Sequence, residues 1–237
     1  MNTSTPLKWR HFQAKIILLC IRWYLHYPLS YRDLQEILLE RGLHVEHTTI
    51  YCWVQYYAPE LEKRGLPHLN ATNGSWRVDE TYVKVKKVWI YLYCAVDSQG
   101  KPLEFLFSPR RDAEAAKRFF AKALAAPHIS PPRVITVDTN AAYPKAIKEL
   151  KVEGIMPDAC ELRQSKYLNN HVEQDHRFIK RLVEQGIGFF SSETAWPHPC
   201  RGYETMNMLR KGRVRGVEKG DSRKQMACIA SLFGVAV

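Results

Sequence analysis

The chain has 237 residues, 46% of them hydrophobic, and its net charge is +11. That length allows one good-sized core plus a small accessory module, and the basic excess favours a polyanionic partner, either nucleic acid or an anionic membrane surface. The strongest apolar run, residues 16–21, is far too short to span a bilayer. No secretion signal is visible and the six cysteines are scattered without a C-x-x-C pair, so we expect a reduced cytoplasmic protein with neither a membrane span nor a zinc ribbon.

Residues 1–62 are expected to be helical. An amphipathic first helix is indicated by apolar residues three to four positions apart: Phe12, Ile16, Leu19 and Trp23. Ser30 can cap a second helix that ends at Gly42, and Thr48 or Thr49 can cap a third. Two helices joined through a glycine turn resemble a helix-turn-helix, although an ordinary helical hairpin has the same pattern. Together with the basic charge, the pattern favours a DNA-binding domain.

The composition changes after that region. Residues 63–75 hold Pro, Gly and Asn with few apolar residues, which predicts a linker. From residue 76 to residue 212, stretches rich in Val, Tyr, Trp and Phe alternate with helical patterns, and this part is expected to be the second domain. Residues 213–237 are basic and then apolar, and we interpret them as a C-terminal tail.

Residues 76–212 predict a mixed α/β fold. The expected strands are residues 76–85, 89–96, 103–107, 133–138 and 159–163, and the expected helices are residues 112–125, 143–150 and 169–181. Antiparallel strands followed by alternating helices and strands give a mixed sheet covered by helices. Beyond residue 186 the pattern is less regular, with a short helix at 206–211, and Pro197 and Pro199 are expected to break a helix before it.

Three acidic residues stand at unusual positions. Asp79 lies inside a predicted strand, where aspartate is disfavoured, and Asp138 ends a buried strand, at the edge where α/β folds keep their ligands. Glu173 shares one side of a helix with His176 and Lys180. Converging carboxylates repel one another unless cations hold them, and Mg²⁺ prefers such oxygen ligands. If the fold brings these acids together, they predict a metal-dependent centre for phosphoryl transfer.

Several sequence blocks resemble those of the DDE transposases of bacterial insertion sequences, and most closely the insertion-sequence-six family. The blocks are WRVDETYVKV, YLYCAVDSQG, RRDAEAAKRFF, VITVDTNAAYPKAI and KYLNNHVEQDHRFIKR, and two further blocks, WRHFQAKIILLCIRWYL and SYRDLQEILLERG, match nearer the N-terminus. They occur in the family's order, from about Trp9 to Lys211. The resemblance therefore covers nearly the whole chain.

The resemblance implies an RNase H-like catalytic core holding two Mg²⁺ ions, for which Mn²⁺ can substitute. Asp79, Asp138 and Glu173 are the implied metal ligands and catalytic residues. Residues 139–172, which are 34 residues, lie between the second aspartate and the glutamate, and this spacing is characteristic of the family. A basic residue seven positions after the glutamate is also characteristic, and Lys180 fills that place. The implied activity is cleavage and strand transfer of DNA at the terminal inverted repeats of the element.

The resemblance also implies partners and DNA contacts. Lys180 is expected to bind a DNA phosphate, with Arg177 and His176 beside it, although a solvated charge or a packed histidine would fit the same pattern. Further candidates on the DNA-reading helix are Thr48, Thr49, Tyr51 and Gln55. The implied partners are the inverted repeats, target DNA and at least one further copy of the chain, because two DNA ends are joined. The implied location is the bacterial cytoplasm, on the nucleoid when DNA is bound.

The chain departs from the family pattern at Thr139, where lysine is usual, at Cys94, where arginine is usual, and around Pro197 and Pro199. These departures keep open an alternative, a catalytically decayed copy that acts only as a sequence-specific DNA-binding protein. A hydrolase of RNA in hybrids is a third interpretation, and the helix-turn-helix pattern argues against it.

Overall fold

The structure is a computed structural model that describes residues 11–85, 88–165, 176–177, 180–182 and 197–236. Contacts divide the chain into two compact units: Met1–Leu69 with Gln185–Val237, and Asn70–Glu184. Within the described ranges, no helix has both the length and the apolar character needed to cross a membrane. The two units are described separately below.

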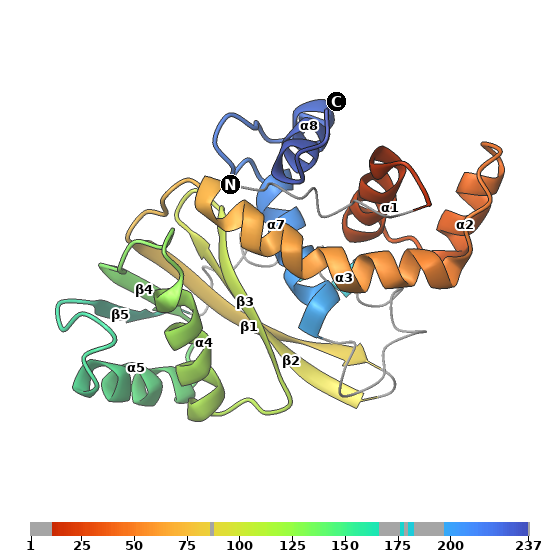
Figure 1. Cartoon of the computed structure of the whole chain (residues 1–237). Coiled ribbons are helices and arrows are strands. Elements are labelled where there is room, and N and C mark those ends of the chain that lie inside the picture. Colours follow the sequence, from red (N-terminus) through yellow and green to blue (C-terminus); the bar gives the residue numbers. More distant parts are fainter. Residues whose placement is uncertain (1–10, 86–87, 166–175, 178–179, 183–196, 237) are drawn as a thin grey trace. The chain divides into compact units, whose positions relative to one another are not determined.

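The first unit consists of helices (Figure 1). They are α1 (Ala14–His26), α2 (Tyr31–Leu39), α3 (His47–Gly65), the short 3-10 helix η1 (Leu66–His68), α7 (Pro197–Arg210) and α8 (Ser222–Leu232). Helix α7 packs against both α1 and α3. Gly202 permits this close approach, because a Cβ atom there would lie 2.7 Å from the Cβ of Ala58 on α3. Helix α8 was not expected from the sequence of the tail.

The starts of α2 and α7 can be compared with what the sequence predicted. Ser30 caps α2 as predicted: its hydroxyl accepts from the Asp33 amide, and the Asp33 carboxylate accepts from the Ser30 amide. The expectation that Pro197 and Pro199 break a helix is wrong. Both lie in the first turn of α7, where the amide hydrogen that proline lacks has no helical partner to lose. The expected short helix at 206–211 is the second half of α7.

The start of α3 also differs from expectation. The predicted cap at Thr48 or Thr49 is wrong, because α3 begins at His47, before both threonines, and Glu46 provides no side-chain cap. Instead, the side-chain oxygen of Gln35 on α2 accepts the His47 amide at 3.0 Å. That bond satisfies one of the amides that a helix start leaves without a partner. It also ties α2 to the beginning of α3.

The second unit has the mixed α/β fold that the sequence predicts (Figure 1). Its strands are β1 (Ser75–Val85), β2 (Val88–Asp97), β3 (Pro102–Ser108), β4 (Val134–Val137) and β5 (Glu161–Gln164). They form a five-stranded sheet in the order β3-β2-β1-β4-β5. β1, β2 and β3 are antiparallel neighbours, whereas β4 runs parallel to both β1 and β5.

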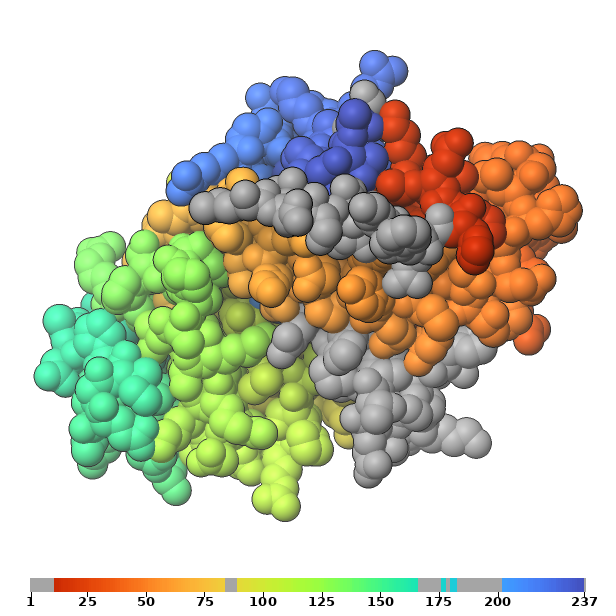
Figure 2. All heavy atoms as spheres, viewed as in Figure 1, coloured from red at the N-terminus to blue at the C-terminus, as the bar shows by residue number. Residues whose placement is uncertain are grey.

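Helices α4 (Ala113–Ala125) and α5 (Ala142–Val152) lie side by side and share one hydrophobic core with the sheet (Figures 1 and 2). Trp76 and Val78 of β1 are fully buried in that core, together with Tyr143 of α5. Because residues two apart on a strand share a face, Glu80 follows Trp76 and Val78 on the side of the sheet that α4 and α5 cover. An acid therefore ends a row of core residues.

Part of the expected pattern falls outside the described residues. Of the predicted helix 169–181, the described residues His176, Arg177, Lys180 and Arg181 are helical, whereas Glu173 is not among them. Helix α3 runs past residue 62 to Gly65, and β1 begins at the end of the expected linker. The two units are defined by contacts between residues, whereas the expected domains were defined by their functions. The division into 1–62, 63–75, 76–212 and 213–237 therefore stays a prediction.

Candidate active site

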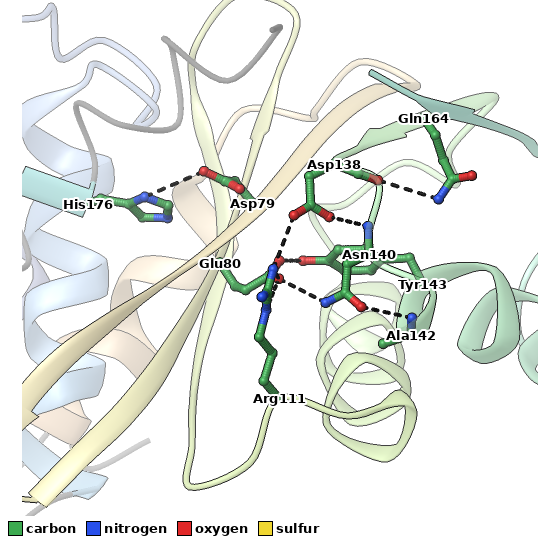
Figure 3. A network of polar contacts seen from close by, with 9 residues as sticks. All are labelled: Asp79, Glu80, Arg111, Asp138, Asn140, Ala142, Tyr143, Gln164 and His176. Atoms are coloured by element: carbon green, nitrogen blue, oxygen red, sulfur yellow. Dashed lines mark hydrogen bonds and ion pairs between the residues drawn. The ribbon is translucent and has the colours of Figure 1, made fainter. Parts of the chain in front are cut away.

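Two of the predicted acids meet because their strands are parallel neighbours. β1 and β4 pair in a register that ends with Arg77 beside Thr136. Continuing that register by two residues places Asp79 beside Asp138. One carboxylate oxygen from each of Asp79, Glu80 and Asp138 lies within 4.8 Å of the others (Figure 3). The structure thus brings together Asp79 and Asp138 and adds Glu80, which the sequence interpretation missed.

Glu80 is held by three donors. Its side chain is only 1% exposed. Oε1 accepts from Arg111 Nε at 2.5 Å and from Asn140 Nδ2 at 3.0 Å, and Oε2 accepts from the Tyr143 hydroxyl. Adjacent strand residues face opposite sides of a sheet. The prediction of Asp79 as a metal ligand therefore gave no reason to place the neighbouring Glu80 in the same site. The available signal was an acid that continues the buried face of β1, since a buried carboxylate requires partners.

Asp138 is oriented by groups from three segments (Figure 3). Its Oδ1 accepts from the Asn140 amide at 2.9 Å, and its Oδ2 accepts from Arg111 Nη2 at 3.1 Å. Its backbone carbonyl accepts from Nε2 of Gln164, the last residue of β5, at 3.5 Å. The carboxylate is 25% exposed, and Arg111 bridges it to Glu80. The site is therefore an acidic cluster with one arginine between two of its members.

Asp79 and Asp138 resist deprotonation. The pKa of Asp79 is raised to about 7, first by burial and then by the nearby charges of Glu80 and Asp138. Burial also raises the pKa of Asp138. Burial and the neighbouring Glu80 raise the pKa of the Tyr143 hydroxyl well above its usual value, so it remains a hydrogen-bond donor. A cation at this point would relieve the repulsion.

His176 lies beside Asp79, and Lys180 lies near His176 and Tyr82. His176 is 4% exposed, with its Nδ1 3.8 Å from Asp79 Oδ2. Burial, and then the charge of Lys180, lowers the pKa of His176 to about 4, so the imidazole is neutral at pH 7. Lys180 Nζ lies 5.7 Å from the ring centroid of Tyr82, whose side chain is exposed. Arg177 is exposed.

The candidates on the predicted DNA-reading helix all lie in the first half of α3. Thr48 is exposed, and Thr49, Tyr51 and Gln55 are partly exposed. The Tyr51 ring packs edge-to-face on Tyr31 of α2, with centroids 5.5 Å apart. These residues belong to the first unit, so the structure does not group them with the acidic cluster.

Replacing Asp79 with Asn is expected to stabilise the metal-free protein at pH 8 and to change little at pH 4. Because the folded-state pKa is raised to about 7, the contribution of Asp79 to stability is fully present below the unfolded pKa of about 4 and is lost as the pH rises through 7. Asparagine stays neutral throughout. Melting temperatures in EDTA from pH 4 to pH 8 test this: the difference between variant and wild type should grow with pH, and a constant difference would contradict the prediction. His176 titrates in both proteins and largely cancels in the difference.

The sequence of the chain was compared with those of known protein families and proteins. A family model described as a DDE domain matches residues 73–213. A transposase for the insertion sequence-like element IS431mec from Staphylococcus aureus strain Mu50 is 43% identical over 214 residues, covering 89% of this chain and 91% of the relative. The chain belongs to the DDE transposases of bacterial insertion sequences. The predicted resemblance to the insertion-sequence-six family is thereby confirmed.

Other similar proteins accompany that match. The transposase for IS257 in transposon Tn4003 of Staphylococcus aureus is 42% identical to this transposase over the same length, with 89% and 91% of the two chains covered. Among solved structures, the HTLV-2 integrase catalytic core domain in complex with magnesium is similar with a TM-score of 0.44 and 17% identity. That alignment covers 63% of this transposase and 94% of the integrase domain.

Proposed function

We propose that this transposase cuts and joins DNA at the terminal inverted repeats of an insertion sequence, using Asp79, Asp138 and Glu173 as catalytic metal ligands. The observation that carries the proposal is the convergence of Asp79 and Asp138 on neighbouring strands of a chain that matches a DDE domain over residues 73–213. Glu173 lies outside the described residues, and its role rests on the family pattern alone. The second unit supplies the RNase H-like core of this proposal.

The described donors fit a hard divalent cation. Asp79 and Asp138 offer only carboxylate oxygens, within 4.8 Å of each other. The pKa of Asp79 is raised first by burial and then by repulsion from Glu80 and Asp138, and a cation would relieve that repulsion. We propose two Mg²⁺ ions, with Mn²⁺ as a substitute. When bound, such ions activate water or a 3′-hydroxyl for in-line attack on a phosphodiester and stabilise the leaving oxygen.

The chain's own residues prepare the site. Asn140 and Arg111 hold the Asp138 carboxylate in one orientation, so little reordering is needed before the reaction. The buried His176 covers one side of Asp79 and limits the access of water. Its neutral imidazole adds no charge beside the acids at pH 7. We therefore propose that His176 shields the Asp79 carboxylate and so helps to position it, in addition to the DNA contact expected for His176.

DNA is proposed to bind along two surfaces. In the second unit, the basic residues Arg177 and Lys180 belong to the same stretch as His176, which lies beside Asp79, and they offer phosphate contacts. In the first unit, α2 and α3 form the proposed helix-turn-helix, with Thr48, Thr49, Tyr51 and Gln55 as candidate readers of the inverted repeats. Target DNA is the second nucleic-acid partner. Because two element ends must be joined, we propose an assembly of at least two copies, acting on the nucleoid in the bacterial cytoplasm.

The proposal is tested with a labelled duplex carrying the element's own end and a scrambled duplex of equal length. Wild-type protein should bind the end more tightly and cut it in Mg²⁺ or Mn²⁺ but not in EDTA. Binding should be measured in Ca²⁺ at fixed salt, since phosphate contacts make affinity strongly salt-dependent. Tight end binding without any cutting in Mg²⁺ or Mn²⁺ would favour the decayed, binding-only copy.

A further inference from the structure

We propose that Glu80 and Arg111 are positioning residues of this site: Glu80 holds Arg111, Arg111 holds the Asp138 carboxylate, and Glu80 itself is not a metal ligand. The inference rests on the proposed function, because it concerns how the chain presents Asp138 to a divalent cation. Glu80 belongs to the same cluster as the two aspartates, so proximity alone would make it the third ligand. The contacts of its carboxylate assign it a different role.

Both oxygens of Glu80 are already engaged by the protein. Oε1 accepts two hydrogen bonds, from Arg111 and Asn140, and Oε2 accepts one from Tyr143. A carboxylate offers about four acceptor positions, so three donors leave it little capacity. The side chain is 1% exposed, compared with 25% for Asp138. Mg²⁺ usually keeps several waters, and a hydrated ion reaches an exposed carboxylate oxygen more easily than a buried one.

Arg111 connects the two acids through the geometry of its side chain. Arg111 Nε donates to Glu80 at 2.5 Å, and Nη2, which also pairs with Glu80 Oε1, donates to Asp138 at 3.1 Å. Its planar fork of donors can serve two carboxylates at once, whereas a lysine ammonium acts as a point charge on a flexible stem. Arg111 comes from the connection between β3 and α4, outside the two strands that carry the acids. Glu80 therefore holds the Arg111 guanidinium in place, and the guanidinium in turn orients the Asp138 carboxylate.

Glu80 also secures the chain segment that follows Asp138. Asn140 donates its side-chain amide to Glu80, donates its backbone amide to Asp138, and accepts the Ala142 amide with its own side-chain oxygen at 3.0 Å. Tyr143, at the start of α5, donates to the same glutamate. One buried carboxylate thus joins β1, the turn after β4 and the first turn of α5 (Figure 3). Loss of Glu80 is expected to release the segment that presents Asp138.

The two possible roles of Glu80 predict opposite changes in the metal-free protein. If Glu80 were a ligand whose repulsion by Asp79 and Asp138 outweighs its three hydrogen bonds, Glu80→Gln would remove a repelling charge and raise the melting temperature, as expected for Asp79→Asn at pH 8. If Glu80 is an anchor, the same change deprives Arg111 and the donors around it of a charged acceptor. The melting temperature in EDTA should then fall by about 3–10 °C.

A second measurement separates positioning from simple structural support. Mn²⁺ affinity should be measured by titration at 20 °C, well below any unfolding, on full-length wild type, Glu80→Gln, Arg111→Lys and the double variant. Loss of an orienting outer contact weakens metal binding by about 10-fold. Because Glu80 acts on Asp138 through Arg111, the double variant should bind Mn²⁺ no more weakly than the single variant with the lower affinity. Asp138→Asn is the ligand control and should lose most of the binding.

The outcomes distinguish the alternatives. A higher melting temperature with loss of Mn²⁺ binding in Glu80→Gln would make Glu80 a ligand and overturn the inference. A lower melting temperature with unchanged Mn²⁺ affinity would make Glu80 merely structural and also overturn it. If Glu80→Gln does not fold, Arg111→Lys decides alone, because Arg111 is 42% exposed and its replacement leaves the core intact. No Mn²⁺ binding by the wild type would instead refute the proposed metal site, and with it any positioning role.

Discussion

Asp138→Asn is expected to leave binding of the element end nearly unchanged and to reduce Mg²⁺-dependent cutting by at least about 10³-fold, or roughly 4 kcal/mol of transition-state stabilisation. The substitution keeps the shape of the side chain, and its remaining oxygen can still accept from Asn140. It removes the charge that would hold a cation beside Asp79. Gel-shift and cleavage assays on one labelled duplex measure both properties.

The matched control is Asp112→Asn. Asp112 directly follows Arg111 in the chain, but it caps α4 by accepting the Ala115 amide at 2.8 Å. Asparagine caps helices about as well as aspartate, so this variant should cut DNA at close to the wild-type rate. If Asp138→Asn cut within about 10-fold of the control, which is roughly 1.4 kcal/mol, the assignment of Asp138 as a catalytic ligand would be refuted.

The second large effect concerns the strand that carries the acids. Trp76→Ala is expected to destabilise the protein by about 3–5 kcal/mol and to lower its melting temperature by about 6–20 °C. Trp76 is fully buried on β1, three residues before Asp79, within the core that α4 and α5 share with the sheet. Truncation leaves a cavity that rigid neighbours fill only in part. Calorimetry in EDTA measures the shift without a contribution from bound metal.

Trp76→Phe provides the comparison. Among the described residues, the indole N–H of Trp76 has no hydrogen-bond partner. Phenylalanine removes that buried donor while retaining most of the aromatic volume, so the cost should stay below about 1.5 kcal/mol. An equally large loss in both variants would show that the indole N–H has a partner and that cavity formation is not the main cost.

Much of the site could be anticipated from local pattern. Asp79 and Asp138 were identifiable because each stands where its residue type is unusual, within a strand and at a strand end, and because the blocks around them resemble a known family. Ser30 followed the same logic, since a capping box is a short-range arrangement that needs no tertiary contact. Such features lie within a few residues of one another, where spacing alone carries the information.

Other features depend on contacts between distant residues. The start of α3 was misplaced because its first amide is satisfied by Gln35, 12 positions earlier in the chain. The helix with Pro197 and Pro199 was missed because proline's effect depends on where a helix begins, and sequence alone did not locate that start. Helix α8 was missed because the tail's composition suggested no packing partner, whereas α1 and α3 contact it.

By itself, the sequence determined the family, the mixed α/β class and the identity of two acids, because periodicity and ordered motifs are local properties of the chain. Only the tertiary structure decided that Glu80 lies buried among three donors and that Arg111, 31 positions away, bridges it to Asp138. The physical reason is that a carboxylate's role depends on what surrounds its oxygens. The parallel pairing of β1 with β4 and the packing of α5 on the sheet supply those surroundings.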